Sequence, residues 1–167
     1  MPLPFDPIQE AQRQWDAHWG TEATAAMGAV TSIMRAQQIL LARLNEMLEP
    51  WELTFPRYEA LMLLSYTRTG ALPLGKMGDR LQVHRASVTN VVDRLVGQRL
   101  VERVPREGDR RSVLAQITPE GRRVAREATE RLHTERFGTG PLSDPRCDEL
   151  FALLRPLRQR AGDFELE

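Results

Sequence analysis

The sequence has almost no cysteine, because Cys147 is the only one in 167 residues. A single thiol forms no disulfide within the chain, and with no neighbouring cysteine it builds no thiolate metal site. A secreted fold held together by disulfides is therefore excluded, and a reduced, intracellular setting is favoured. We expect Cys147 to be a buried structural residue.

Metal-binding and catalytic patterns are also missing. The histidines His18, His84 and His133 have neither the spacing nor the carboxylate neighbours of a metal site. The sequence contains no glycine-rich phosphate loop and no nucleophile motif. We therefore expect no metal, no cofactor and no catalytic residues, which means a protein that is not an enzyme.

No stretch of the sequence approaches about 18 consecutive apolar residues, the length that predicts a membrane-spanning helix. The N-terminus has no basic segment followed by an apolar run, so a secretion signal is not expected. Hydrophobic residues still make up 41% of the chain, which suffices for a full core. We expect one domain in a cytoplasmic protein with no membrane partner.

The chain has no net charge, because Lys+Arg and Asp+Glu each number 23. The charges are nevertheless unevenly distributed along the sequence. Between Lys76 and Arg111 there are nine basic and five acidic residues, an excess of four that leaves the remainder of the chain net negative by four. If the protein binds an anionic partner, this segment is where we expect the contact.

Apolar residues at helical spacing, interrupted by turn residues, predict a mainly helical chain. The expected helices cover, in order, residues 7–19, 24–48, 56–67, 74–81, 87–96, 118–137 and 143–161. The segment Arg68–Leu72 is expected to be a loop. Two short stretches, 100–104 and 112–118, alternate or are β-branched and predict strands. Pro105 and Gly108 lie between them, so the strands should form a hairpin.

Two of the predicted helices are short and separated by only three residues. Leu74, Met77 and Leu81 are the apolar residues of the first, and the turn Gln82–His84 is expected to point Val83 inward. The second helix should bury Val88, Val92 and Leu95. This layout is typical of a helix-turn-helix, and the hairpin that follows it is typical of a wing.

The second of these helices presents polar side chains on its outward face. They are Arg85, Ser87, Thr89, Asn90, Asp93 and Arg94. Asparagine can bond adenine, arginine can bond guanine or a phosphate, and short hydroxyls can bond either base edges or phosphates, so this face suits a DNA major groove. The alternative is an ordinary solvated helix face. His84 opens the helix and is expected to contact a phosphate or to cap the helix.

The hairpin tip, "PREGDRRS" at residues 105–112, carries three arginines. A thin turn can enter the narrow, negative minor groove while the preceding helix lies in the neighbouring major groove. Asp109 is placed to hold Arg111 or Arg110 by a charge-assisted hydrogen bond. The alternative is that these side chains only satisfy one another in a solvated turn, where ion pairs contribute little.

The segment "LGKMGDRLQVHRASVTNVVDRLVGQRLVERVPREGDRRSVLAQITPEG" resembles the winged helix-turn-helix of MarR-type transcriptional regulators. The helices before and after it also match the layout of that family. The resemblance implies a mainly α fold with a small β-hairpin wing. It divides the chain, 1–167, into dimerisation helices over about 1–50 and 119–167 and a DNA-binding lobe over about 55–118.

The resemblance also implies roles for residues and partners. Ser87, Thr89, Asn90 and Arg94 would contact groove or phosphate, and Asp109 with Arg111 would form the wing pair, with Arg110 a close competitor for the tip. A homodimer would place two winged lobes on an inverted-repeat operator in double-stranded DNA, and a small ligand often releases such proteins from DNA.

Aromatic and polar side chains outside the helix-turn-helix are candidates for a pocket that binds a small aromatic or phenolic effector. They are Trp15, His18, Trp19, Trp51, Tyr58 and Glu59. The alternative for these residues is packing in the core or in the dimer interface.

Taken together, the sequence predicts a homodimeric, sequence-specific DNA-binding regulator, a repressor that a small ligand releases from its operator. The alternative is a winged-helix module that binds proteins and not DNA. The neutral net charge and acids such as Glu107 in the wing favour this alternative.

Overall fold

The computed structural model describes the backbone of residues 2–106 and 109–165, together with their side chains except those of Arg85, Arg106 and residues 109–112. The chain divides into two compact units, Met1–Arg43 and Leu44–Glu167. The boundary falls near the C-terminal end of the long helix α2 (Thr24–Leu48).

The N-terminal unit consists of helix α1 (Pro7–Trp19) and most of α2. Asp6 caps α1, because its Oδ1 accepts hydrogen bonds from the backbone N–H of Ile8 at 2.9 Å and of Gln9 at 3.4 Å. Gly20, with φ of 82°, ends the helix in the left-handed region that glycine adopts without strain. Both helices agree with the predicted ranges.

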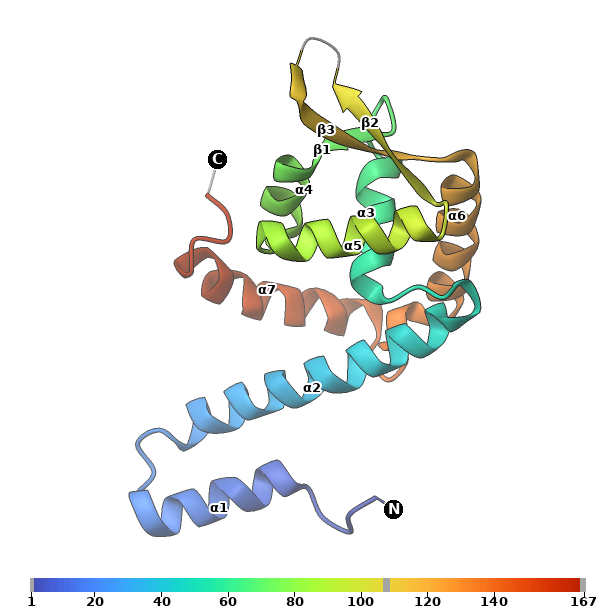
Figure 1. Ribbon diagram of the computed structural model, residues 1–167. Helices are drawn as coiled ribbons and strands as arrows, with labels where there is room; N and C mark the ends of the chain where they lie inside the picture. Colours follow the sequence, from blue (N-terminus) through green and yellow to red (C-terminus); the bar gives the residue numbers. More distant parts are fainter. Residues whose placement is uncertain (1, 107–108, 166–167) are drawn as a thin grey trace. The chain divides into compact units, whose positions relative to one another are not determined.

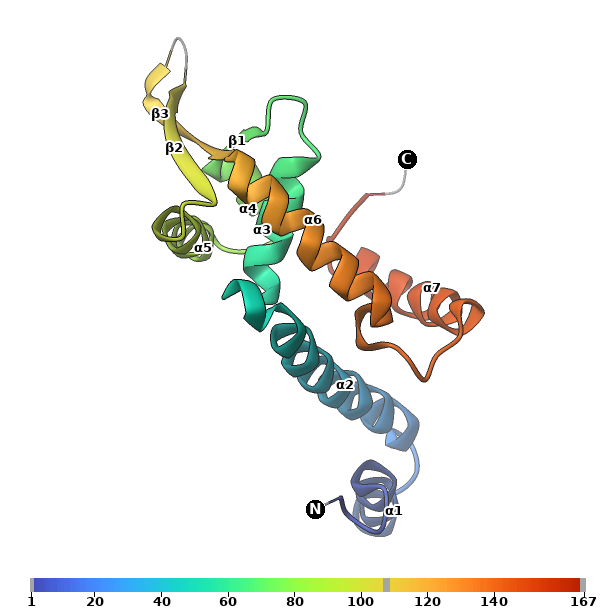
Figure 2. The same cartoon turned by 90° about the vertical axis from the view of Figure 1, so that its right-hand side faces the viewer.

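The second unit contains the remaining elements (Figure 1). After α2 they are η1 (Glu49–Trp51), α3 (Phe55–Ser65), β1 (Ala71–Pro73), α4 (Leu74–Leu81), α5 (Arg85–Gly97), β2 (Val101–Arg106), β3 (Asp109–Ile117), α6 (Pro119–Thr134), η2 (Arg136–Gly138) and α7 (Asp144–Arg160). Helices α4 and α6 lie on opposite sides of α3 (Figures 1 and 2).

Helices α4 and α5 form the predicted helix-turn-helix. Gln82 ends α4 in the left-handed region at φ of 54°, and the Val83 N–H donates to the Gly78 carbonyl at 3.2 Å. Gly78 allows the close approach, because a Cβ there would lie 3.3 Å from the Val83 carbonyl oxygen. The inward position predicted for Val83 is wrong, since this side chain is 42% exposed. Met77 and Val88 fill the space between the two helices instead.

The sheet has three antiparallel strands in the order β1-β3-β2. Strand β1, which pairs Leu72 with Ala115, lies in a segment expected to be a loop. Three residues are too few for a periodic pattern, and β1 forms because the longer β3 offers it a partner. The β2–β3 hairpin, which pairs Val104 with Leu114, extends beyond the helices as the predicted wing (Figure 1).

The core of the second unit lies where α3, α4, α5, the base of the sheet and α6 meet. Its fully buried members come from every one of these elements and from the end of α2: Leu48, Ala60, Leu61, Leu64, Met77, Val88, Val92, Leu95, Val101, Ala115, Ala128 and Leu132. This set includes all three apolar residues predicted to anchor α5. The core therefore fixes α5 against the rest of the lobe.

Helix α6 begins directly after β3. The Thr118 Oγ1 accepts from the Gly121 N–H at 2.9 Å and caps the helix, and Pro119 occupies the first turn. Gly121 packs against the backbone of Leu100, at the start of β2, so closely that a Cβ there would overlap the Leu100 carbonyl oxygen. The start of α6 is thereby fixed at the base of the wing.

This close approach gives a prediction about stability. Gly121→Ala should destabilise the fold by about 2 kcal/mol or more, because the added methyl meets a main-chain carbonyl that a side-chain rotation does not clear. Gly75→Ala is the matched control. Nothing lies within 4 Å of a Cβ at Gly75 in α4, so that change should be neutral or slightly stabilising. Urea denaturation of the two variants measures both effects, and equal midpoints would contradict the prediction.

Candidate nucleic-acid interface

Helix α5 turns a polar face outward because its opposite face is buried. Ser87, Asn90 and Arg94 follow one another at spacings of three and four residues, so they lie on one side of the helix, and all three are exposed. Within the part of the chain that the structure describes, their side chains make no hydrogen bond or ion pair. A hydroxyl, an amide and a guanidinium are therefore available to a ligand.

The other predicted contacts lie near the N-terminus of α5 and in the wing strand β3. His84 is the N-cap, and its Nδ1 accepts from the Ala86 N–H at 3.2 Å. Of the two roles predicted for His84, this is the capping role. Thr89 is half-buried on the flank of the helix. The side chains of Arg85, Asp109, Arg110 and Arg111 lie outside the described residues, although their backbone belongs to α5 and β3.

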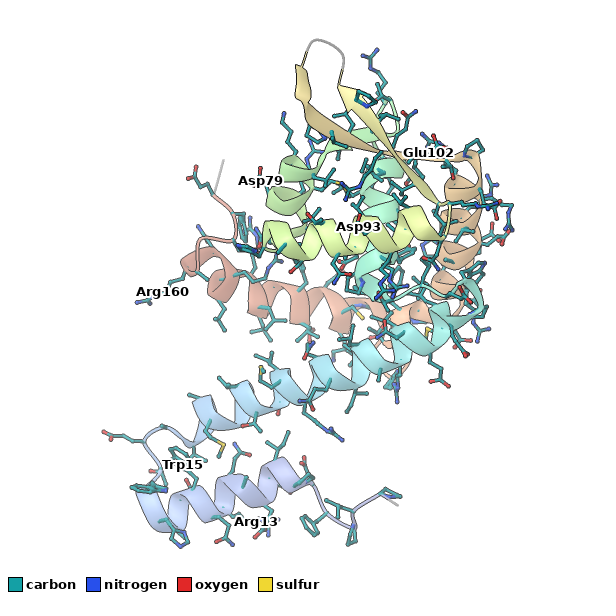
Figure 3. The ribbon with its side chains drawn as sticks, in the orientation of Figure 1. Arg13, Trp15, Asp79, Asp93, Glu102 and Arg160 are labelled. Atoms are coloured by element: carbon teal, nitrogen blue, oxygen red, sulfur yellow. The ribbon has the colours of Figure 1, made fainter. Side chains whose placement is uncertain are left out.

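Asp93 also lies on the outward side of α5 (Figure 3). Its Oδ1 accepts from Arg103 of β2 at 2.7 Å, an ion pair between the helix and the first strand of the wing. Asp93 was predicted to be one of the outward polar residues, and no role was predicted for Arg103. The sequence alone contains no signal for this pair, since ten residues and a turn separate the two.

A groove of about 540 Å³ lies between α3, the turn Gln82–His84 and α5. Its lining consists of Thr54, Pro56, Arg57, Glu59, Leu81, Val83, Ser87, Val88, Asn90, Val91 and Arg94. The exposed polar residues of α5 thus also form one wall of the groove. Arg57, half-buried, donates from Nη1 to the Glu52 carbonyl at 2.8 Å, and partial burial raises the pKa of Glu59.

The other candidates for a ligand pocket have different surroundings. In the second unit, Trp51 donates to Glu127 at 3.2 Å, and the Tyr58 hydroxyl bonds Thr129 Oγ1 at 2.9 Å. Burial raises the pKa of Tyr58, which also stacks on Phe55. Neither side chain lines the groove that contains Glu59.

In the N-terminal unit, Trp15 and Trp19 line a separate hollow of about 390 Å³ together with Glu22 and Ala23. Trp19 is 78% exposed there. His18 donates from Nδ1 to the Gln14 carbonyl at 2.7 Å. Of the three side chains, Trp15 is half-buried, and His18 and Trp19 are exposed.

The described C-terminal residues contact the helix-turn-helix. The Gln82 side chain donates to the Asp163 carbonyl, and the Asp163 carboxylate pairs with Arg158 at 2.6 Å. The guanidinium of Arg158 also lies over the ring of Phe164, at 5.6 Å from its centroid. Cys147, in α7, is half-buried.

The described residues form neither a metal site nor a membrane-spanning helix. No group of three or more His, Cys, Asp or Glu side chains there is arranged to hold a metal ion. In the same part of the chain, no helix combines the length and the apolar character needed to cross a lipid bilayer.

A helix-turn-helix followed by an antiparallel sheet with a projecting hairpin defines a winged helix-turn-helix protein. The MarR family model matches residues 53–113, which span this module. Sco5413 of Streptomyces coelicolor, a MarR family transcriptional regulator, is 51% identical with a TM-score of 0.79, over 85% of this chain and 99% of its own. The chain belongs to the MarR family of transcriptional regulators.

Two further relatives extend the comparison. BpsR of Bordetella bronchiseptica, whose DNA binding is regulated by 6-hydroxynicotinic acid, is 26% identical with a TM-score of 0.66, over 76% of this chain and 90% of its own. The HTH-type transcriptional regulator YhbI of Bacillus subtilis is 34% identical over 85 residues, 51% of this chain and 54% of its own. The chain therefore spans about half the length of this curated relative.

These comparisons confirm the family that the residues between Leu74 and Gly121 resemble, and they confirm the fold class, mainly α with a small wing. The relatives are transcriptional regulators, in agreement with the expectation that the chain is not an enzyme. The sequence did not predict the groove or its residue Arg57, because the groove is formed by three elements that meet only in the folded chain.

The raised pKa of Glu59 gives a prediction about pH. The folded protein holds the Glu59 proton more tightly than the unfolded chain, so this residue lowers stability as pH rises from the ordinary glutamate pKa through the raised one. In the Glu59→Gln variant the side chain does not ionise, so this loss of stability is absent. The variant should be slightly more stable than wild type at neutral pH, with a difference that disappears below about pH 4. Thermal denaturation of both proteins across this range measures it, and a pH-independent difference would contradict the assignment.

Proposed function

We propose that the chain is a sequence-specific DNA-binding transcriptional regulator that acts as a homodimeric repressor on an inverted-repeat operator. The observation that carries the proposal is the polar face of α5, with Ser87, Asn90 and Arg94 exposed on one side. An amide that can pair with adenine and a guanidinium that can pair with guanine or phosphate suit a major groove. Occupation of an operator would then block access to a promoter.

Further contacts complete the proposed interface. His84 uses Nδ1 to cap α5, so a neutral imidazole carries its proton on Nε2 and can donate it to a phosphate. Arg85 and Thr89 extend the contacts of α5. In the wing, Arg111, or its competitor Arg110, enters the minor groove, and Asp109 holds the guanidinium.

The proposed dimer rests on apolar side chains that remain exposed on helices of both units. On α2 they are Val30, Ile33, Met34 and Ile39, and on α7 they are Leu150, Phe151, Leu153 and Leu157. Apolar surface of this kind is usually covered by a partner. We assign the dimer interface to about 1–50 and 119–167 and the DNA-binding lobe to about 55–118. Two-fold symmetry would place the two α5 helices ~34 Å apart, one helical turn of DNA.

We further propose a small aromatic or phenolic effector. The α3–α5 groove combines apolar walls, such as Val91 and Leu81, with the charged side chains of Arg57, Glu59 and Arg94. That mixture suits an aromatic ring bearing polar substituents. BpsR, which responds to 6-hydroxynicotinic acid, supports this class of ligand. Of the residues predicted to form an effector pocket, only Glu59 lines this groove; Trp15, His18, Trp19, Trp51 and Tyr58 do not.

The second candidate function is a winged-helix module that binds proteins and not DNA. The observation in its favour is the formal net charge of zero, since DNA-binding surfaces usually carry a basic excess. The two functions differ in how binding responds to salt. Contacts with phosphate release counterions, so affinity for DNA falls steeply as salt is raised.

The proposal predicts the following outcome with DNA. Selection from randomised duplexes should yield an inverted repeat with half-sites about 10 base pairs apart, and affinity for it should fall steeply with salt. Asn90→Ala and Arg94→Ala should each cost ~1–3 kcal/mol of binding free energy and lose base preference at one position. Arg111→Ala should weaken binding to many sequences alike, because a wing arginine in the minor groove contributes mainly through its charge.

Arg146→Ala is the control for these variants, because Arg146 is an exposed arginine that pairs with Glu149 and is not one of the apolar residues on which the proposed dimer rests. Gel filtration should show that its oligomeric state is unchanged. Its affinity should stay within about twofold of wild type. Fluorescence anisotropy with a labelled duplex measures the affinity of the wild type and of all four variants. Wild-type protein that binds no duplex at low salt would favour the protein-binding module.

The effector gives a separate prediction. Hydroxylated aromatic acids, with 6-hydroxynicotinic acid as the first probe, should lower the affinity for the selected duplex, because a ligand in the groove contacts Ser87, Asn90 and Arg94. Arg57→Ala should weaken this response more than it weakens DNA binding. Titration of each acid into the protein–duplex complex tests it. If no acid releases the duplex, the effector proposal is wrong while the DNA-binding proposal stands.

A further inference from the structure

The ion pair between Asp93 and Arg103 joins the two parts of the proposed interface. Asp93 belongs to α5, which carries the proposed major-groove contacts, and Arg103 belongs to β2, which leads to the tip of the wing (Figure 3). The Arg103 Nη2 lies 2.7 Å from the Asp93 Oδ1, and the two side chains are 36% and 59% exposed. Among the described residues, the other ion pairs lie outside the module formed by α4, α5 and the wing.

The backbone between α5 and β2 supplies another anchor. Arg99 turns the chain in the left-handed region at φ of 60°, and the Leu100 N–H donates to the Leu95 carbonyl at 3.0 Å. Leu100 and Val101 are then buried in the core. This anchor fixes the base of the wing. The ion pair lies two residues further along β2, so the helix and the strand are held at two separate points.

We propose that Asp93 and Arg103 are positioning residues, which set the angle between α5 and the wing so that both reach DNA together. The inference rests on the proposed function. Asp93 then acts through Arg103 and reads no base. An unpaired carboxylate on this face would repel phosphate, and its pairing with Arg103 cancels that charge. Arg103 in turn is engaged by Asp93 and does not serve as a phosphate contact.

An exposed ion pair of this kind contributes little to the stability of the fold. Its effect on binding is different, because the apparent Kd is the intrinsic Kd divided by the fraction of protein in the competent arrangement. If the wing moves relative to α5, that fraction falls, although no contact with DNA is removed. We therefore expect an effect on affinity without a matching effect on thermal stability.

The sign of the effect of Asp93→Asn separates positioning from simple electrostatics. The substitution removes a negative charge from a surface that faces phosphates, so electrostatics alone predicts tighter binding. Positioning predicts weaker binding, by up to about fivefold, the range of one exposed ion pair. Asp93→Glu, which keeps the carboxylate, should restore most of the loss. Glu102→Gln is the matched control, since it removes one exposed carboxylate from the same strand, where among the described residues Glu102 forms no ion pair, so its affinity should be unchanged or higher.

Arg103→Ala should weaken binding at least as much as Asp93→Asn, because it also leaves the Asp93 carboxylate unpaired, and the double variant should be no worse than Arg103→Ala. The salt dependence of affinity should stay unchanged in all three, because no phosphate contact is lost. Tighter or unchanged binding by Asp93→Asn would overturn the proposal. So would a salt slope that falls by about one unit in Arg103→Ala, which marks a lost phosphate contact.

A measurement on the free protein keeps the inference separate from the proposed function. Amide hydrogen exchange of residues 102–104 should be faster in Asp93→Asn than in wild type, because one of the two anchors is lost. If wild-type protein binds no duplex, the proposed function fails and exchange alone decides whether the pair positions the wing. Unchanged exchange in that case would overturn the inference.

Discussion

The structure depends above all on the burial of one face of α5. Val88, Val92 and Leu95 are at most 1% exposed, and they fix the rotation of the helix about its own axis. Because a helix repeats every 3.6 residues, this rotation also determines which side chains face outward. The polar side chains of Ser87, Asn90 and Arg94 are exposed because burial of the apolar face turns them toward solvent. The packing of the core therefore also determines the proposed interface.

The wing depends on the same core. Val101 at the start of β2 and Ala115 in β3 are buried with the α5 residues, while β1 pairs with β3 from the other side. A free two-stranded hairpin is marginally stable in water, and a third strand with a packed base stabilises it. The Asp93–Arg103 pair adds a polar link between the strand and the helix. The helix α5 and the wing are therefore held together by both the core and this ion pair.

The α3–α5 groove relates two functions through shared residues. Ser87, Asn90 and Arg94 line it from one side, and Arg57 and Glu59 line it from the other. A molecule in the groove and a duplex on α5 would compete for the same polar groups, so each would lower the affinity for the other by thermodynamic linkage. In this arrangement, coupling needs no long pathway through the protein.

The sequence by itself determined the order of the helices, the helix-turn-helix and the wing, because apolar periodicity and turn residues are local signals. It also marked the polar face of α5. Only the tertiary structure decided the exposure of Val83, the strand β1, the groove and the partner of Asp93. Each of these depends on residues distant in the chain that become neighbours when the core closes, and no local pattern records such a contact.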